Sequence, residues 1–179
     1  IISLIFLIII SPIFILICIF IKIDSPGSIF FITERVGVNN TRFKMVKFRS
    51  MYKDTEIVET SNLKDANIKV TKIGKFLRKF SIDEVPQFFC VLAGKMSIVG
   101  PRPALLSQHD LIEKRKQLGI DTLKPGITGL AQINGRDLIS LEKKINFEAE
   151  YLKKKGFFFD LKIIIKTIKV VITQKGVSH

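Results

Sequence analysis

The sequence predicts a mostly helical α+β protein that is attached to a membrane, with a small β-hairpin and amphipathic helices around a basic body. Three observations lead to this fold class. The first 21 residues carry no charged side chain, although the chain of 179 residues has a net charge of +13. Later stretches place apolar residues at helical spacing with lysines between them. Two short runs of β-branched and aromatic residues flank a glycine–asparagine turn.

Residues 1–22 are the predicted membrane element, and residues 23–179 are the predicted cytoplasmic, membrane-associated domain. A helix of 21 uncharged residues is about 31 Å long at ~1.5 Å per residue, close to the ~30 Å hydrocarbon core of a bilayer. The polar flank after it contains no small-residue cleavage site, so the segment does not fit a signal peptide. Lysine and arginine beside a membrane segment stay in the cytoplasm, which orients the basic remainder.

Ser11 and Pro12 stand at the centre of this element. Pro12 cannot donate a hydrogen bond to the carbonyl of Ile8, so we expect a kink there. A kinked helix can still span the bilayer, because proline is tolerated in membrane helices. The alternative is a helix that breaks at Ser11–Pro12 and returns to the same face. The residues alone favour the spanning helix.

A hairpin and a polar loop follow the membrane element. Turn residues at 26–27 end the apolar segment. Residues 29–32 and 43–48 are predicted as strands around a turn at residues 37–40. Residues 52–67 are polar and mixed in charge, which predicts a loop.

Helical spacing dominates the second half of the chain. Apolar positions between residues 68 and 80 recur every three or four residues, with lysines and an arginine between them. The other expected elements are helices at residues 85–92, 104–118 and 141–155, a strand at residues 96–99, and a glycine-punctuated loop at residues 124–136.

The last predicted helix, residues 157–172, is apolar apart from a stripe of three lysines, Lys162, Lys166 and Lys169. Such a pattern suits a helix that lies at the bilayer surface near anionic lipids. A core helix with a solvated lysine face explains the pattern equally well.

The adjacent carboxylates Asp83 and Glu84 are the first candidate for chemistry. A capping box formed by Ser81 and Glu84 would explain them structurally, but Pro86 would then lie inside the helix. A cap nearer Asp83 places Pro86 in the first turn, where its missing donor matters little. Glu84 is then available for another role.

Basic side chains form the second candidate group. Arg102 lies between Pro101 and Pro103, which limit where its guanidinium can point. Arginine forks match phosphate oxygens, and glycines near residue 130 would allow a ligand to approach the backbone. The candidate phosphate-binding residues are Lys47, Arg49, Arg78, Arg102 and Arg136.

A membrane-attached basic body with an acidic pair suits phosphoanhydride chemistry on a lipid phosphate. A carboxylate can attack phosphorus to give an acyl phosphate, and a divalent cation can screen the pyrophosphate. Two cysteines and two histidines exclude a cysteine-rich zinc site and a multi-histidine metal centre. The sequence also lacks a P-loop, a dinucleotide fingerprint and an HExxH motif.

Several long motifs, in order, resemble those of the bacterial sugar transferase family, the monotopic phosphoglycosyl transferases. They are Lys47-Phe48-Arg49-Ser50-Met51, Ser81-Ile82-Asp83-Glu84-Val85-Pro86-Gln87, Ser97-Ile98-Val99-Gly100-Pro101-Arg102-Pro103, Pro125-Gly126-Ile127-Thr128-Gly129, Ala131-Gln132-Ile133-Asn134-Gly135-Arg136 and Asp160-Leu161-Lys162. Two positions depart from the family pattern. Leu130 replaces the usual tryptophan, and both Glu148 and Glu150 precede Tyr151 where one acidic residue is usual.

The resemblance implies an enzyme that transfers a sugar 1-phosphate from a UDP-sugar to undecaprenyl phosphate with Mg²⁺ and releases UMP. Asp83 would be the nucleophile that forms a covalent phosphosugar intermediate, and Glu84 its partner, with both carboxylates as the metal ligands. Arg78 and Arg102 would hold phosphates, and Arg136 would contact the nucleotide.

The resemblance also bears on the membrane. Ser11–Pro12 matches the family's helix-breaking pair, which implies a re-entrant helix in the bacterial inner membrane and a catalytic core that faces the cytoplasm. The implied partners are the UDP-sugar, undecaprenyl phosphate, membrane lipid and downstream glycosyltransferases.

Two other function classes compete with this enzyme. The charge of +13 would suit a membrane-tethered nucleic-acid binder, but the lysines are spread over several elements and aromatic stacking platforms are not evident. We therefore expect no nucleic-acid partner. A non-catalytic scaffold for polysaccharide assembly is opposed by the complete Asp-Glu and Pro-Arg-Pro motifs.

Overall fold

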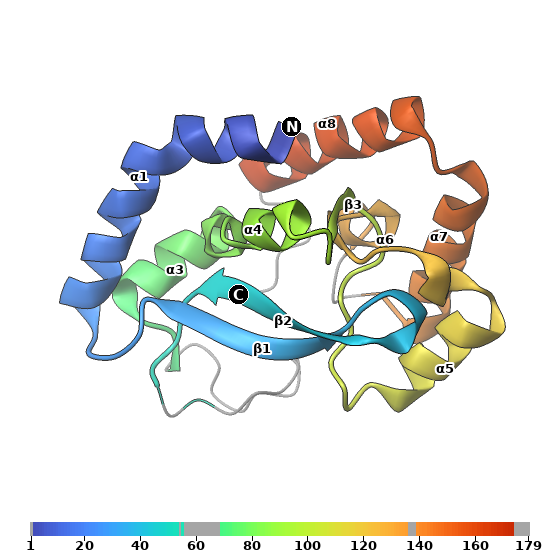
Figure 1. Ribbon diagram of the computed structural model, residues 1–179, viewed down its shortest axis with the longest axis horizontal. Coiled ribbons are helices and arrows are strands. Elements are labelled where there is room, and N and C mark those ends of the chain that lie inside the picture. Colours follow the sequence, from blue (N-terminus) through green and yellow to red (C-terminus); the bar gives the residue numbers. More distant parts are fainter. Residues whose placement is uncertain (1, 54, 56–68, 136–138, 174–179) are drawn as a thin grey trace.

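The computed structural model describes residues 2–53, 55, 69–135 and 139–173, and helices predominate among them (Figure 1). The larger elements are α1 (Ile2–Asp24), β1 (Phe30–Val36), β2 (Arg42–Phe48), α3 (Lys72–Lys79), α4 (Gln87–Leu92), β3 (Ser97–Val99), α5 (His109–Gln117), β4 (Gly126–Thr128), α6 (Leu130–Ile133), α7 (Leu141–Lys154) and α8 (Phe157–Thr173). Short 3-10 turns are η1 (Val38–Asn40), η3 (Ile82–Glu84) and η4 (Ile120–Thr122). The predicted mixture of helices and a small hairpin is confirmed.

Helix α1 stays helical through Pro12 and bends visibly along its length (Figure 1). Pro12 leaves the carbonyl of Ile8 without its usual helical donor. The Ser11 hydroxyl donates to that carbonyl over 2.8 Å, so the Ser11–Pro12 pair supplies its own replacement bond. Among the described residues, α1 is the single helix that is long and apolar enough to cross a membrane.

The hairpin is longer than the sequence predicts. Strands β1 and β2 pair antiparallel with Phe30 opposite Phe48 and Val36 opposite Arg42. The turn contains Asn39 and Asn40, both with positive φ (50° and 59°), a conformation that asparagine tolerates better than most residues. The polar residues of β1 escaped prediction because apolar runs alone marked the strands.

Strand β4 forms in a stretch that was predicted as a loop. It pairs parallel with β3, and the amide of Gly100 donates to Thr128 over 2.8 Å. A Cβ at Gly126 would lie 2.1 Å from the Gly100 nitrogen. Glycine is therefore required for this close backbone contact, and Gly126, which was predicted to admit a ligand, brings two segments together here.

Helix α5 begins later than predicted, at His109. Before the helix, the Gln108 side chain accepts a hydrogen bond from the Leu105 amide over 2.8 Å. This bond closes a turn, so the segment is not helical. The other predicted helices differ from the observed ones only at their ends. Most of the loop predicted at residues 52–67, and Arg136, lie outside the described residues.

The largest apolar core joins α5, α7 and α8 beneath β3. Its buried members include Val99, Leu111, Ile120, Ile145 and Ile163. Tyr151 in α7 also donates to Asp160 in α8 over 2.9 Å, and burial together with this carboxylate raises the pKa of the Tyr151 phenol.

Helix α8 combines both alternatives weighed for it. Ile163 is buried in the core, whereas Phe158, Ile165 and Ile172 are 82%, 60% and 70% exposed. The three lysines of the stripe are also exposed. One face therefore packs inward, and the remaining surface mixes apolar and basic side chains as expected at a bilayer surface.

Candidate active site

A sharp turn between α3 and α4 presents Asp83 and Glu84. Ser81 adopts the left-handed conformation (φ 55°, ψ 24°), which is strained for a residue with a Cβ. Its hydroxyl makes no capping bond, so the capping box suggested by the sequence does not form. Pro86 stands at the N-cap of α4, so the helix begins later than the predicted cap near Asp83, and the missing donor of Pro86 still costs no helical bond. Asp83 and Glu84 thus lie on the 3-10 turn η3, before helix α4 begins.

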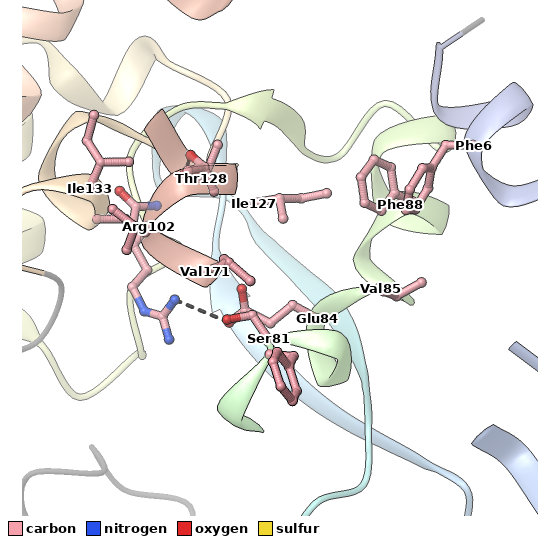
Figure 2. A pocket seen from close by; sticks show the side chains of 14 residues that line it. Phe6, Ser81, Glu84, Val85, Phe88, Arg102, Ile127, Thr128, Ile133 and Val171 are labelled. Carbon is pink, nitrogen blue, oxygen red and sulfur yellow. Dashed lines mark hydrogen bonds and ion pairs between the residues drawn. The ribbon is translucent and has the colours of Figure 1, made fainter. Parts of the chain in front are cut away.

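Glu84 is bound by two cations from different elements. Lys47 of β2 donates to its Oε1 over 2.8 Å, and Arg102, which follows β3, donates to the same oxygen over 3.3 Å. The Glu84 side chain is 12% exposed and that of Arg102 is 36% exposed. Figure 2 shows the Arg102 guanidinium reaching across the cavity to Glu84. The ion pairs therefore join three segments that are far apart in the sequence.

Asp83 differs from Glu84, because it makes no hydrogen bond or ion pair with any described residue. Burial raises the pKa of the Asp83 carboxyl, and the neighbouring Glu84 carboxylate raises it further. Lys47, Arg78 and Arg102 oppose this shift, Lys47 most strongly. The result is a half-buried carboxyl group whose oxygens are not committed to the fold and which lies in the field of three cations.

A buried ion pair that the sequence analysis missed holds the Arg102 backbone. Arg115 of α5 binds both oxygens of Glu148 of α7, and its Nη2 also donates to the Arg102 carbonyl over 2.9 Å. The signal was present: Arg115 and Glu148 each occupy a position of the apolar stripe of their helix. The alternative acid, Glu150, is exposed and pairs with Lys154.

Four predicted site elements therefore meet at one place, and among the described residues Arg49 does not join them. The structure brings together Lys47, Arg78, Arg102 and the Asp83–Glu84 pair. Arg49 points elsewhere: its guanidinium is buried and donates to the Ser25 and Pro26 carbonyls at 2.7 and 3.0 Å. Arg49 thus ties the end of α1 to β2 in place of joining the phosphate-binding group, and Arg136 is outside the described residues.

A cavity of about 270 Å³ opens beside Glu84 and Arg102. Figure 2 shows Phe6 of α1 and Phe88 of α4 at one side, and Thr128 and Ile133 at the other. The remaining lining residues, Phe80, Ser81, Val85, Ile127, Gln132, Thr167, Val170 and Val171, come from η3, β4, α6, α8 and their flanks. The cavity is thus mainly apolar, with charge at one edge, and α1 and α8, which carry many exposed apolar side chains, form part of its wall.

The described residues contain no cluster of three or more His, Cys, Asp or Glu that could hold a metal ion. The pair Asp83–Glu84 nevertheless fits Mg²⁺, which is commonly held by one or two carboxylates while substrate phosphates and water complete its octahedron. The uncommitted oxygens of Asp83 suit this role best.

Comparison with known proteins gives one consistent result. The family model described as bacterial sugar transferase matches residues 1–174. The chain is 42% identical to the uncharacterized sugar transferase EpsL of Bacillus subtilis, over 88% of this chain and 76% of that protein. It is 41% identical to the UDP-glucose:undecaprenyl-phosphate glucose-1-phosphate transferase of Klebsiella pneumoniae, over 94% of this chain but 38% of that protein.

A third relative is the UDP-N-acetylgalactosamine-undecaprenyl-phosphate N-acetylgalactosaminephosphotransferase of Aeromonas hydrophila. It is 36% identical over 93% of this chain and 40% of its own length. The chain therefore spans less than half of the Klebsiella and Aeromonas relatives, and these two relatives are named for different sugars.

Proposed function

Because the chain belongs to the bacterial sugar transferase family, we propose that it transfers a sugar 1-phosphate from a UDP-sugar to undecaprenyl phosphate and releases UMP. The observation that carries this proposal is the gathering of Lys47, Arg78 and Arg102 around the Asp83–Glu84 pair. Cations suit a pyrophosphate, and a carboxylate with uncommitted oxygens suits a nucleophile.

The first step is attack by an Asp83 carboxylate oxygen on the sugar-linked phosphorus. A bond forms between that oxygen and phosphorus, and the bond from phosphorus to the bridging oxygen breaks, so UMP leaves with the electron pair. The product is an aspartyl phosphosugar. Arg102 and Arg78 bind the pyrophosphate oxygens, and the hydrogen bond from Arg115 to the Arg102 carbonyl helps to position Arg102.

In the second step a phosphate oxygen of undecaprenyl phosphate attacks the same phosphorus, and the Asp83 carboxylate leaves unchanged. Separation into two steps means that the lipid phosphate meets the single phosphate of the aspartyl intermediate after UMP has left, and not the more highly charged pyrophosphate. Glu84 keeps Lys47 and Arg102 in place through its Oε1. Asp83 and Glu84 would hold Mg²⁺, which when bound neutralises pyrophosphate charge.

The acceptor suits the membrane side of the cavity. Phe6 lies on α1, and Val171 lies on α8, whose outer surface is rich in exposed apolar side chains. A polyprenyl chain is apolar, so it can remain among lipid tails while its phosphate reaches the cationic edge of the cavity. We place the protein at the bacterial inner membrane on this basis, with the site on the cytoplasmic side.

We further propose that α1 is re-entrant. The bend, and the Ser11 bond that replaces the one lost at Pro12, allow a stable change of direction inside the bilayer. In a chain with Cys18 and Cys90 replaced by alanine, a new cysteine before Ile1 and another at Ser28 should both react with an impermeant maleimide in inverted vesicles and neither in spheroplasts. Reaction of the N-terminal cysteine in spheroplasts alone would establish a spanning helix.

The reaction is tested by incubating the lipid-embedded chain with a panel of UDP-sugars, undecaprenyl phosphate and Mg²⁺. UMP release with one donor, absent with EDTA and absent in Asp83→Asn, is the expected result. Without the acceptor, a labelled sugar phosphate should remain on the wild-type protein. UMP release that persists in Asp83→Asn would contradict the role of Asp83, and no release with any donor would contradict the reaction.

A further inference from the structure

Gln132 of α6 is a buried polar side chain whose hydrogen-bonding groups are unused. The residue is 6% exposed, it lines the cavity beside Glu84 and Arg102, and neither its Nε2 nor its Oε1 has a partner among the described residues. Buried amides are nearly always paired. An amide left unpaired inside a ligand cavity therefore points to a bond that forms only when the ligand is bound.

The other polar groups at this end of the cavity are already paired. Thr167 donates to the Ile163 carbonyl over 2.8 Å, so the Thr128 hydroxyl is the donor in the 2.7 Å bond between the two threonines. These hydroxyls satisfy one another and the backbone. Gln132 is consequently the residue here whose donor and acceptor are both unused; its amide atoms are covered, so the side chain must turn toward the cavity to bind a ligand.

The local backbone fixes Gln132 in this position. A Cβ on Gly129 would lie 2.1 Å from the Gly100 carbonyl oxygen and 2.7 Å from Oε1 of Gln132. Only a glycine allows the segment before α6 to pack so closely against the segment that leads to Arg102. The amide and the Arg102 guanidinium are therefore held by two directly apposed segments.

We propose that Gln132 binds the imide edge of uracil in the UDP-sugar, and this inference rests on the proposed function. Uracil presents two nearly apolar faces and an edge on which an N–H donor adjoins carbonyl acceptors, and the amide of glutamine complements that edge. The walls near Gln132 include Ile127, Ile133 and Val171, which suit the faces of a planar base. A hexose would bring hydroxyls around its whole ring into contact with these apolar side chains.

The test compares wild type, Gln132→Leu and Gln117→Leu in lipid nanodiscs. Gln117 carries the same amide on the exposed surface of α5, so it is the matched control. Inhibition by UMP and by 3-methyl-UMP, whose methyl group blocks the imide N–H, is measured on transfer from the UDP-sugar that wild type uses fastest. We expect wild type and Gln117→Leu to bind UMP about tenfold more tightly than 3-methyl-UMP. Gln132→Leu should bind UMP about tenfold more weakly and no longer distinguish the two.

Two results would overturn the assignment. Unchanged UMP inhibition in Gln132→Leu would do so, including the case in which only turnover of the UDP-sugar falls, since that would place the amide on the sugar. A lower Tm without nucleotide in both Gln132→Leu and Gln132→Met would also do so, because it would show an amide already satisfied, for example by internal water. An unpaired amide predicts an equal or higher Tm.

Failure of the assignment is distinguishable from failure of the function. If wild type transfers no sugar phosphate and binds no UMP, the proposed function is wrong. If wild type is active and Gln132→Leu responds to both nucleotides as wild type does, only the role of Gln132 is wrong.

Discussion

Glu84 and Glu148 are both paired with arginine, but they do different work. Glu148 is 2% exposed and receives two bonds from a single guanidinium, so the pair with Arg115 is closed and rigid. Glu84 shares one oxygen between Lys47 and Arg102, beside the uncommitted Asp83. The Arg115–Glu148 pair holds two helices and a loop together. The cluster around Glu84 leaves charged groups at a place where a substrate can bind them.

Burial and ion pairing alone therefore do not identify a functional site. A buried ion pair whose donors and acceptors match one another is weak evidence for function. Apolar residues can replace it with little loss of stability. Folding raises the pKa of the Asp83 carboxyl, so the ionised form lowers the stability of the fold. The rest of the structure offsets this loss. The two regions should therefore respond oppositely to neutralisation.

Asp83→Asn should have the largest effect. We expect transfer to fall by about 10⁴-fold or more, the scale seen when a nucleophile is removed, because the amide cannot form the acyl phosphate. UMP release and labelling of the protein by the sugar phosphate measure this loss. Residual labelling at the wild-type level would exclude Asp83 as the attacking group.

The same variant should be as stable as wild type or more stable. Folding raises the pKa of Asp83, so the protonated form favours the fold; that stability is present at low pH and is lost as the pH rises through the raised pKa. Without Mg²⁺, the Tm of Asp83→Asn should therefore exceed that of wild type increasingly from acid to neutral pH. A constant difference in Tm across this range would contradict the raised pKa.

Glu148→Gln should show the opposite balance, mainly a loss of stability. Removal of the carboxylate leaves Arg115 buried without its counter-charge, which costs about 3–5 kcal/mol in the free energy of unfolding. Denaturant unfolding measures this loss. The double variant Arg115→Met, Glu148→Leu should recover most of the stability and still transfer poorly, because nothing then holds the Arg102 carbonyl. Full recovery of transfer in the double variant would show that Arg115 does not position Arg102.

Arg102→Lys should have a smaller effect on transfer. Lysine keeps the charge beside Glu84 but loses the planar fork that can bind two phosphate oxygens at once. We expect kcat/KM for the UDP-sugar to fall by about 10- to 100-fold, with the Tm unchanged within 2 °C. A drop in Tm like that of Glu148→Gln would place Arg102 with the structural pair.

The sequence predicted the residues that gather around Asp83 and Glu84 better than it predicted the buried pair of Arg115 and Glu148. Asp83, Glu84 and Arg102 lie in short motifs with unusual local chemistry, a carboxylate pair and an arginine between prolines, so they stand out within a few residues. Their meeting with Lys47 could be guessed only from the sum of such motifs. The hairpin and the long helices followed from local periodicity in the same way.

The rest depended on partners distant in the sequence. Arg49 looks like a phosphate ligand until the carbonyls of the α1 terminus, 23 and 24 positions earlier, are seen to accept its donors. Strand β4 forms because Gly100 and Gly126 permit two backbones to touch. Gln132 lies in one of the family motifs but received no role from the sequence, since an amide in a four-residue helix becomes notable only when the cavity around it is known.

The smallest expected effect belongs to Glu150→Gln, which calibrates the comparison. Glu150 lies on the same helix as Glu148, two residues later, and pairs with Lys154 over 2.8 Å, but its side chain is 42% exposed. Exposed pairs of this spacing contribute about 0.3–0.5 kcal/mol, so the unfolding midpoint in denaturant should scarcely move and transfer should match wild type. Salt should erase what difference remains, whereas it should not rescue Glu148→Gln. Equal losses of stability in Glu150→Gln and Glu148→Gln would mean that removal of any charge from α7 disturbs the fold. The buried pair would then be no more important for stability than the exposed pair.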